Sequence, residues 1–337
     1  MAFFVENQTV KRAEILPMLA QLDDGSFMGT ALRLFRYQAR YNPLYARWLE
    51  LLGRRAVDVT SLEDIPCLPI HFFKTHAVQT GRWAAKTIFT SSATTGQTPA
   101  QHLVRDVDLY LHQARRGFTH FYGDPADWCV LALLPAYLER TGSSLVAMAN
   151  DFIQRSRYPE SGFFLHDFQA LRATLERCQA QSIPTLLLGV SFALLDFAEQ
   201  QPINLQGVTV METGGMKGRR HELTRPALHT LLKAAFQLDA IHSEYGMTEL
   251  FSQAYALGGT LFRPAPTMQV LATEIYDPFG PAAPGRTGVL NVIDLANVDT
   301  CAFIATEDVG KVYADGSFEV LGRLDAAELR GCNLMVE

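Results

Sequence analysis

Apolar positions along the chain change their spacing twice. In the first 80 residues they recur at the spacing of one helix face, as at Leu32, Phe35, Leu44, Trp48 and Leu51. From Trp128 onward, short apolar runs alternate with segments of helix length. After Leu261, turns rich in proline and glycine separate short strand-like runs. The chain therefore begins with helices, continues with alternating strands and helices, and ends mostly in strands.

This order predicts an α/β fold in which crossover helices flank mixed sheets, followed by a β-rich final section. We divide the chain into a helical N-terminal region (1–80) packed on the core, an α/β core (81–260) and a β-rich section (261–337). The sequence shows no internal repeat and no flexible linker, so we expect one compact unit. One helix can be delimited directly, because Thr224 and Pro226 are typical of a helix start. Its expected buried stripe is Leu228, Leu231, Leu232 and Ala235.

Composition narrows the class of protein. The chain has 337 residues, of which 48% are hydrophobic and 19% charged, with a net charge of −6. Such a chain can bury a large core, and without a basic stripe it is not expected to bind nucleic acid. There is no secretory leader pattern and no apolar run near the ~20 residues of a membrane span, so we expect a cytoplasmic protein. The five scattered cysteines favour neither a disulfide framework nor a zinc site.

Residues 90–99 read TSSATTGQTP and directly follow a strand-like run. Hydroxyl groups and backbone N–H groups around a glycine turn can surround phosphate oxygens without a fixed positive charge. A plain polar loop has the same composition, so both readings stay open at this point. The segment is not a Walker A loop, because the chain contains no GxxxxGK[ST] motif.

Residues 243–250 read SEYGMTEL. Tyr245 can stack on a purine, and Gly246 lets the backbone approach a ligand closely. Thr248 can reach a phosphate, and Glu249 can hold Mg²⁺ through hard oxygen ligands. The alternative is an ordinary helix cap followed by a solvated carboxylate.

The segments IATEDVG (304–310) and VLGRLD (320–325) carry a third pair of candidates. Asp308 and Arg323 could together bind the two hydroxyls of a ribose, one as acceptor and one as donor. A surface ion pair of little energetic value is the simpler explanation.

The succession TSSATTG, YGMTE, TEDVG and GRLD resembles the adenylate-forming superfamily of acyl-CoA synthetases, adenylation domains and luciferases. The stretches LLPAYLERTGSSLVAM, METGGMKGRR and GRLDAAELRGCNLMVE are similar to acyl-protein synthetases of the LuxE type, relatives of phenylacetate-CoA ligases. The resemblance runs over at least residues 65–337. It implies the large N-terminal region of the adenylate-forming (ANL-type) fold, and ATP-dependent activation of a carboxylic acid as acyl-AMP followed by transfer to a thiol.

The resemblance also implies roles for individual residues. The phosphates of ATP would be held by Ser91, Ser92, Thr94, Thr95 and Gly96. Adenine would be lined by Tyr245 and Gly246. The α-phosphate would contact Thr248, and Glu249 would bind Mg²⁺. A strand-end turn beside the nucleotide and acyl pocket would be formed by Gly214 and Gly215, and the ribose would be bound by Asp308 and Arg323.

Two departures from the family pattern affect the expected chemistry. Many relatives have Pro-Lys at the end of the phosphate loop, but here Pro99 is followed by Ala100. Candidate replacement cations are Lys74, Arg105 and Lys217. Full-length relatives also continue into a small domain with a catalytic lysine, and we expect this chain to lack that domain, as LuxE-type enzymes do.

In LuxE-type enzymes a cysteine near the C-terminus accepts the acyl group, and Cys332 stands at the matching position. A thiolate attacks a mixed anhydride readily, and the neighbouring Arg330 could lower the pKa of the Cys332 thiol. Coenzyme A or a carrier-protein phosphopantetheine thiol is the alternative acceptor, which would make the protein an acyl-CoA or acyl-carrier-protein ligase. The expected partners are a small carboxylic acid and, for such transfer, an acyl carrier protein or an acyl-donor or acceptor enzyme.

Two further alternatives belong to other classes. Residues 189–193 read GVSFA between a strand and a helix, which imitates the nucleophile elbow of a serine hydrolase with Ser191 as nucleophile. The second alternative is a protein that binds a nucleotide or a carboxylate without catalysis. Aromatic-rich segments such as IHFF and GFFLHDF indicate either an apolar acyl pocket or plain core.

Overall fold

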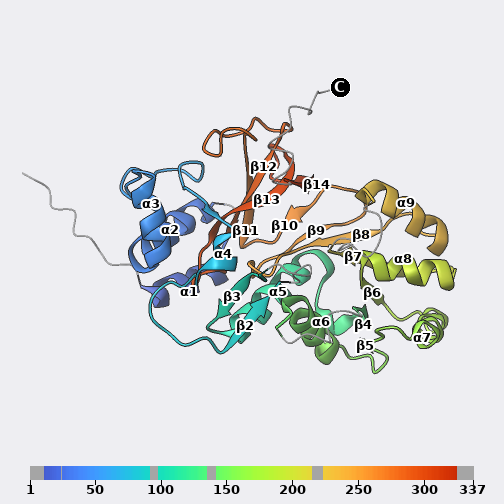
Figure 1. Cartoon of the computed structure of the whole chain (residues 1–337). Coiled ribbons are helices and arrows are strands. Elements are labelled where there is room, and N and C mark those ends of the chain that lie inside the picture. The colour runs from blue at the N-terminus through green and yellow to red at the C-terminus, as the bar shows by residue number, and fades with distance from the viewer. Residues whose placement is uncertain (1–10, 24, 92–97, 135–141, 215–222, 325–337) are drawn as a thin grey trace, which may run out of the picture.

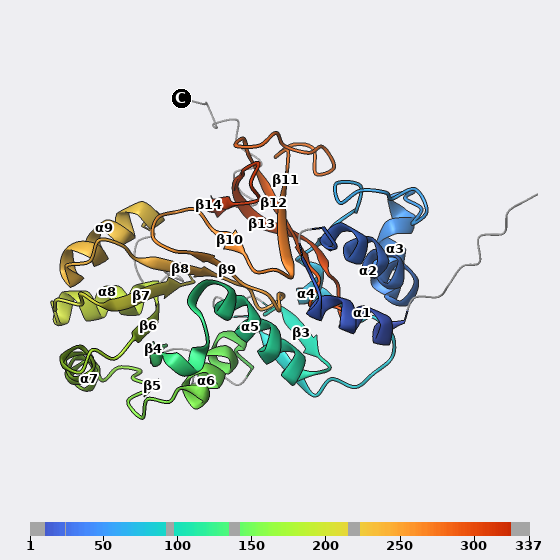
Figure 2. The ribbon, with the colours of Figure 1, turned by 180° about the vertical axis from the view of Figure 1, so that it is seen from behind.

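The computed structural model describes residues 11–23, 25–91, 98–134, 142–214 and 223–324 (Figure 1). Within these residues, two large sheets and one short hairpin organise the chain. Helices α1–α3 lie at one end of the molecule and helices α7–α9 at the other, in both the front and the back view (Figures 1 and 2). The two large sheets lie between these two groups of helices.

The larger sheet has seven strands in the order β10-β9-β8-β7-β6-β4-β5. They are β4 (Cys129–Leu133), β5 (Gly162–Phe163), β6 (Thr185–Val190), β7 (Val208–Thr213), β8 (His242–Tyr245), β9 (Ala254–Ala256) and β10 (Arg263–Pro264). The neighbours from β5 to β8 pair in parallel, whereas β9 and β10 are antiparallel. Strands β4 and β6 are buried along their whole length, which explains their continuous apolar runs.

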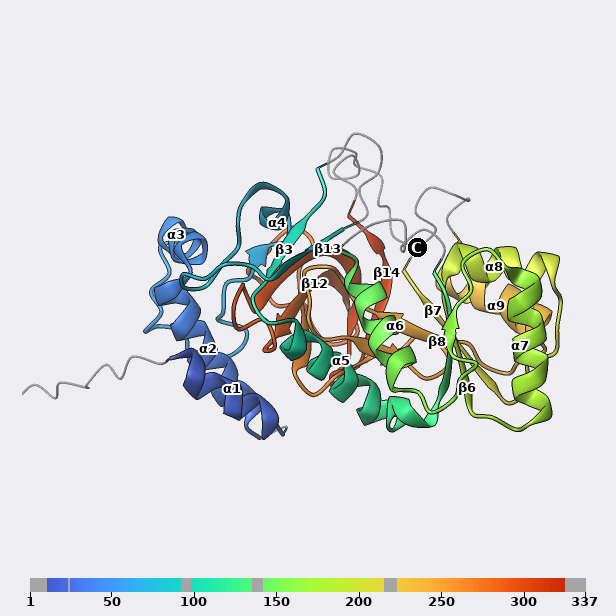
Figure 3. The same cartoon turned by 90° about the horizontal axis from the view of Figure 1, so that it is seen from below.

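Two layers of helices cover this sheet. One contains α5 (Val107–Tyr122) and α6 (Ser144–Arg155), which meet through Phe118 and Phe152 with ring centroids 4.9 Å apart. The short 3-10 helix η1 (Pro125–Asp127) follows α5. The other layer contains α7 (Phe168–Ala180), α8 (Ser191–Gln200) and α9 (Arg225–Phe236), which are joined by ring contacts of Phe197. Figure 3 shows the strands between the two layers, as right-handed crossovers in opposite directions require.

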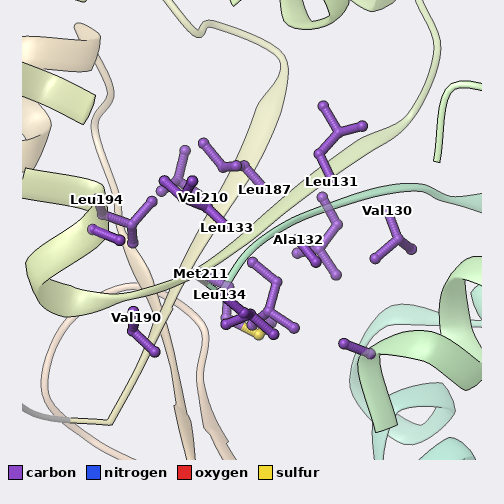
Figure 4. Packing of buried hydrophobic residues seen from close by; sticks show 14 of the residues in the cluster. Val130, Leu131, Ala132, Leu133, Leu134, Leu187, Val190, Leu194, Val210 and Met211 are labelled. Atoms are coloured by element: carbon purple, nitrogen blue, oxygen red, sulfur yellow. The ribbon is translucent and has the colours of Figure 1, made fainter. Parts of the chain in front are cut away.

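The apolar core of this half lies between the sheet and its helices. Figure 4 shows side chains of β4, β6 and β7 packed together there, among them Val130, Leu131, Leu187 and Val210. The predicted start of α9 is confirmed, with Thr224 at the N-cap. One residue of the predicted stripe is wrong: the Leu231 side chain is 51% exposed. Its place in the stripe is taken by His229, since positions 228, 229, 232 and 236 share one helix face.

The second sheet has five strands and carries the predicted β-rich section. It contains β1 (Leu68–Pro69), β11 (Met268–Thr273), β12 (Thr287–Asp294), β13 (Phe303–Val312) and β14 (Phe318–Arg323), in the order β1-β13-β12-β11, with β14 also paired to β13. Helices α1 (Arg12–Ala20), α2 (Phe27–Tyr41), α3 (Pro43–Leu51) and the short α4 (Phe72–Thr75) belong to the same apolar cluster. Phe35, Tyr45 and Phe303 join helices to sheet by ring contacts.

A hairpin of β2 (Thr87–Thr90) and β3 (Gln101–Val104) carries the hydroxyl-rich loop between its strands. The fold therefore presents that loop on a short antiparallel support. In the described part of the chain, no helix combines the length and the apolarity needed to cross a membrane.

Candidate functional site

Tyr245, Asp308 and Arg323 come together where the two large sheets meet. Tyr245 ends β8 of the larger sheet, while Asp308 and Arg323 are register partners on β13 and β14 of the smaller one. The Tyr245 hydroxyl donates to Asp308 Oδ2 at 2.8 Å, and Arg323 Nε donates to Asp308 Oδ1 at 3.1 Å. Three residues separated by up to 78 positions in sequence thus form one hydrogen-bonded group.

The surroundings of Tyr245 decide its protonation. Its side chain is buried and packs against the rings of Phe262 and Phe318, at centroid distances of 5.8 and 5.4 Å. Burial and the nearby Asp308 carboxylate raise the pKa of the Tyr245 phenol, so it remains a hydrogen-bond donor at neutral pH. Little of the ring is exposed to stack on a base.

Glu249 lies near the positive charges of Arg323 and Lys74 and the negative charge of Glu307. Burial raises the pKa of the Glu249 carboxyl, and the charges of Arg323 and Lys74 partly offset that effect. Lys74 is half-buried on α4, far from Glu249 in sequence. Among the described residues there is no group of three or more His, Cys, Asp or Glu side chains able to hold a metal ion. A single carboxylate still fits Mg²⁺, which is commonly bound by one or two carboxylates together with substrate phosphates.

His102 connects the loop-bearing hairpin directly to the YGMTE turn. Because a carbonyl only accepts, His102 Nδ1 donates to the Thr248 carbonyl, at 2.8 Å. His102 Nε2 lies 3.0 Å from the Thr300 hydroxyl, which donates to it in this tautomer. Burial lowers the pKa of His102 to about 4, so the imidazole is neutral at pH 7. His102 does not stand out in the sequence, where its only signal is its position just after the hydroxyl-rich loop.

The turn 294–300 holds the same segment from the other side. Asn297 Nδ2 donates to the Glu249 carbonyl at 2.8 Å. The buried Asp294 carboxylate accepts from the backbone N–H groups of Phe251 and Ser252 at 2.7 and 2.9 Å. The backbone around Thr248 and Glu249 is therefore fixed by three side chains from two other elements. None of the three stood out as a candidate in the sequence.

Two of the candidate cations have different surroundings. Arg105 donates to Asp299 Oδ1 at 3.2 Å, so its charge is already paired. Lys74 acts on Glu249. The third candidate, Lys217, lies outside the described residues. Lys74 is accordingly the best-placed of the described candidates.

Ser91 forms hydrogen bonds with Ala100, at the two ends of the hydroxyl-rich segment. Its hydroxyl accepts from the Ala100 N–H at 2.8 Å, and its own N–H donates to the Ala100 carbonyl at 3.1 Å. The Ser91 hydroxyl keeps its proton available for a further acceptor. The other predicted phosphate ligands, Ser92, Thr94, Thr95 and Gly96, lie outside the described residues, as do Gly215, Arg330 and Cys332.

Gly214 follows the end of β7 with φ of 68°, a conformation that favours glycine. Its carbonyl accepts from the Ser191 hydroxyl at 2.8 Å. The same hydroxyl lies 3.0 Å from Glu212 Oε2, and Arg225 Nε donates to Glu212 Oε1 at 3.0 Å. Although burial opposes it, hydrogen bonds from His229, Ser243 and Arg225 hold the pKa of Glu212 below its ordinary value. Ser191 thus belongs to a buried network that braces the Gly214 turn.

This network argues against the serine hydrolase alternative. Ser191 does begin a helix directly after a strand, as an elbow requires. However, it is buried, its hydroxyl is bonded to a carboxylate rather than to an imidazole, and the non-glycine residues of positive φ in the described chain are Leu165, Ser182 and Gln237. An exposed, strained nucleophile is not present at Ser191.

The comparisons with known proteins agree with this geometry. No protein-family model matches the chain. It is similar to the long-chain-fatty-acid–luciferin-component ligase of Aliivibrio fischeri, with 26% identity over 189 residues, which are 50% of this chain and 49% of that protein. The match thus spans about half the length of the curated relative. It confirms the resemblance to LuxE-type proteins found from the motifs.

Solved structures show the fold. An open conformation of 2-hydroxyisobutyryl-CoA ligase, in complex with 2-HIB-AMP and CoA, is similar with a TM-score of 0.66 and 14% identity, over 90% of this chain and 70% of that chain. ATP-bound MatB from Rhodopseudomonas palustris is similar with a TM-score of 0.53 and 18% identity, over 72% of this chain and 49% of that chain. At these identities the likeness establishes the fold, and the predicted adenylate-forming α/β fold is confirmed.

Proposed function

We propose that this protein activates a carboxylic acid with Mg-ATP as an acyl-adenylate and transfers the acyl group to a thiol. The group formed by Tyr245, Asp308 and Arg323 beside Glu249 supports the proposal, because a hydrogen-bonded carboxylate that would suit a ribose lies near a second carboxylate that would suit Mg²⁺. The sequence similarity to a fatty-acid ligase supports the reaction class. The ATP in one fold neighbour and the acyl-adenylate in the other support the nucleotide.

In the first step a carboxylate oxygen of the acid attacks the α-phosphorus of ATP, the bond to the β-phosphate oxygen breaks, and pyrophosphate leaves. Each Asp308 oxygen already accepts one hydrogen bond and can accept a second, so the carboxylate can bind ribose hydroxyls without losing its partners. Thr248 and the hydroxyls of residues 91–95 would donate to phosphate oxygens. Positioning and charge neutralisation would supply most of the rate enhancement.

Positive charge near the phosphates would come from Lys74, whose charge lowers the pKa of Glu249, whereas Arg323 is already paired with Asp308. Glu249 would hold Mg²⁺, which when bound neutralises charge on the phosphate oxygens. His102 and Asn297 would keep Thr248 and Glu249 in place by binding their carbonyls. The function of these two residues is to position the turn rather than to contact the reacting atoms.

In the second step a thiolate attacks the acyl carbonyl, the bond to the phosphate oxygen breaks, and AMP leaves. Cys332 is the proposed acceptor, on the strength of its match to the family cysteine. Coenzyme A is the second candidate, favoured by the CoA bound to the fold neighbour of higher TM-score. The thioester would then pass to a partner enzyme or remain on CoA.

Two assays test the proposal. Acid-dependent exchange of labelled pyrophosphate into ATP tests adenylation, and Asp308→Ala should abolish most of it. Intact-protein mass spectrometry after incubation with Mg-ATP and a panel of acids tests transfer. We expect a hydroxylamine-labile adduct on wild type and on Cys67→Ser, and none on Cys332→Ser.

The outcomes separate the candidates. AMP release without any adduct, together with CoA-dependent thioester, would favour the acyl-CoA ligase. Nucleotide binding without exchange for any acid would contradict the proposed function and leave the non-catalytic binder. Cys67 is a suitable control because, unlike the other described cysteines, it is not fully buried.

A further inference from the structure

Three buried polar atoms without protein partners belong to α5 and to the strand region around β9, next to β8 of the larger sheet. They are Gln113 Oε1, Gln253 Oε1 and the Tyr255 hydroxyl oxygen, and they belong to a set of five such atoms among the described residues. Their side chains are 4%, 4% and 1% exposed. Buried polar groups are almost always hydrogen-bonded to protein or to ordered water, so three such atoms in one place form a site that can accept hydrogen bonds from a group outside the protein.

Contacts show that these groups form one cluster. A Cβ atom added at Gly117 of α5 would lie 3.8 Å from Gln253 Oε1 and 3.9 Å from Tyr255 Cε2. Gln113 lies one turn before Gly117 on the same helix and thus on the same face. Gln253 and Tyr255 are two residues apart at β9, so their side chains share one face of the sheet. We name Gln113, Gln253 and Tyr255 the polar cluster.

Glu244 borders the polar cluster and connects it to the YGMTE turn. It is the register partner of Tyr255, so both side chains project toward α5. Its carboxylate accepts from the Thr213 hydroxyl. A Cβ atom at Gly246 would meet Glu244 Oε1 and would lie 3.5 Å from Gln253 Cγ, so a larger residue there would displace the Glu244 carboxyl group. The exposed Gly246, which belongs to the YGMTE segment, therefore lies next to Glu244 and Gln253.

The orphaned atoms specify the chemistry of a ligand. Gln253 Nε2 donates to the Phe251 carbonyl at 3.3 Å, which leaves Gln253 Oε1 as the free group. Amide oxygens only accept, so the two glutamines require hydrogen-bond donors, and a tyrosine hydroxyl can both donate and accept. Hydroxyl and ammonium groups supply such donors. A plain hydrocarbon chain would leave all three atoms unpaired.

We propose that the polar cluster recognises the acyl part of the acid substrate, and that this acid carries a hydrogen-bond-donating hydroxyl or ammonium group. The inference rests on the proposed function, since it assigns the substrate class of that site. Such an acid differs from a fatty acid with a long unsubstituted chain. Burial raises the pKa of Glu244 to about 7, so part of the population carries a protonated carboxyl beside the cluster at neutral pH.

The test measures binding separately from turnover. Wild type with Mg²⁺ and a non-hydrolysable ATP analogue is mixed with matched pairs of acids, namely 3-hydroxybutyrate and butyrate, 3-hydroxydecanoate and decanoate, and alanine and propionate. We expect Tm to rise more with the substituted member of at least one pair, and that preference to disappear in Gln253→Leu and Tyr255→Phe. The pair that responds distinguishes hydroxyl from ammonium. With turnover, we expect at least about a tenfold preference in kcat/KM.

Ligand-free stability provides a second readout with matched controls. Tyr255→Phe removes only an unpaired hydroxyl, so its Tm without ligand should stay level or rise. Gln253→Leu removes an unpaired amide oxygen together with one long hydrogen bond to the Phe251 carbonyl, so its Tm should fall less than that of Gln38→Leu. Gln38→Leu and Tyr45→Phe remove buried groups that are paired, to Asn297, Ala302 and Pro66, and their Tm should fall by several degrees. A fall in Gln253→Leu equal to that in Gln38→Leu would overturn the inference, as would equal or stronger binding of every unsubstituted acid. Lack of pyrophosphate exchange with all acids would instead count against the proposed function.

Discussion

Asp308 illustrates how a single side chain gains a function from its neighbours. On β13 its carboxylate is buried, accepts from Tyr245 and Arg323, and retains free lone pairs on both oxygens. An isolated carboxylate would be costly at this depth, but two donors stabilise it. The same two donors orient it for a ligand, so stability and the proposed ribose contact depend on one arrangement.

Replacing Asp308 by asparagine keeps the size of the side chain but removes its charge. We expect KM for ATP to rise by about tenfold, because one hydrogen bond to a charged group contributes roughly 1.5–3 kcal/mol. Exchange kinetics measure the change. Asp315→Asn in the β13–β14 turn is the control, since Asp315 is solvent-exposed and pairs with Ser317 alone in its own turn. An unchanged KM in Asp308→Asn would remove Asp308 from the nucleotide site.

Lys74 can be tested in the same assay. Lys74→Gln should lower kcat/KM for Mg-ATP by about tenfold or more, because it removes a positive charge that acts on Glu249. Its Tm should remain close to wild type, since the side chain is only half-buried. Lys86→Gln, at an exposed lysine, should leave both quantities unchanged. Equal kinetics for the two variants would mean that another cation serves the phosphates.

Glu244 should make stability depend on pH. Its pKa is about 7 in the folded protein and near 4.5 when unfolded, so the folded state binds more protons between these values. The contribution of Glu244 to the free energy of unfolding is therefore fully present below pH 4.5. It is lost as the pH rises through 7, and the loss amounts to about 3 kcal/mol. Glu244→Gln removes that loss. In urea unfolding, the free energy of unfolding of the variant should rise relative to that of wild type between pH 5 and pH 8. A difference that stays constant with pH would contradict the raised pKa of Glu244.

At the scale of elements, His102 links the hairpin β2–β3 to the turn after β8. The strands of the hairpin flank the hydroxyl-rich segment in the sequence, and the turn contains Thr248 and Glu249. A single neutral imidazole bonds to both the Thr248 carbonyl and the Thr300 hydroxyl, and its ring stacks on Phe251 at 4.8 Å. His102 therefore contributes two hydrogen bonds, in addition to the contacts around Asp299, to the relative position of the hairpin and the turn.

Two substitutions of His102 separate packing from hydrogen bonding. His102→Phe keeps an aromatic ring beside Phe251 but leaves the Thr248 carbonyl without its donor. We expect kcat for adenylation to fall by tenfold or more, with little change in KM for the acid. His102→Gln can donate and accept at similar positions, so it should restore a large part of kcat. Equal losses of kcat and Tm in both variants would indicate a packing role only.

At the scale of the whole molecule, Asp299 ties the N-terminal helices to the site. Arg12 on α1 donates two hydrogen bonds to the Asp299 carboxylate at 2.7 and 2.8 Å, and Arg105 after β3 donates a third. Asp299 lies in the turn that also binds Glu249 through Asn297 and His102 through Thr300. The first helix, the hairpin and the YGMTE turn thus share one support.

Breaking this connection should destabilise the protein. Arg12→Ala leaves a buried carboxylate with a single partner, so we expect a loss of about 2–4 kcal/mol in unfolding free energy. Limited proteolysis should cut the α1–α2 connection faster in this variant. Arg47→Ala, which removes an exposed pair with Glu50, should cost well under 1 kcal/mol. Similar losses in both variants would show that Asp299 is not a structural hub.

The sequence by itself determined the class of fold and most of the candidate residues. Strands β4 and β6 are apolar throughout because both faces of a parallel sheet are covered, and that pattern is visible without a structure. Tyr245, Asp308 and Arg323 belong to motifs that can be recognised from their order and spacing along the chain. The helix at 225–236 was found from its cap, although Leu231 was assigned to the wrong face, since a helix stripe is defined only to within one position.

Only the tertiary structure decided which groups meet. His102, Asn297 and Asp294 bind the backbone of one short segment, and backbone carbonyls and N–H groups are the same in every sequence. The unpaired state of Gln113, Gln253 and Tyr255 is likewise invisible along the chain, because a hydrogen-bond partner is defined by distance in space. Sequence patterns record burial and local geometry, whereas pairing between distant polar groups arises only when the sheets and helices have packed.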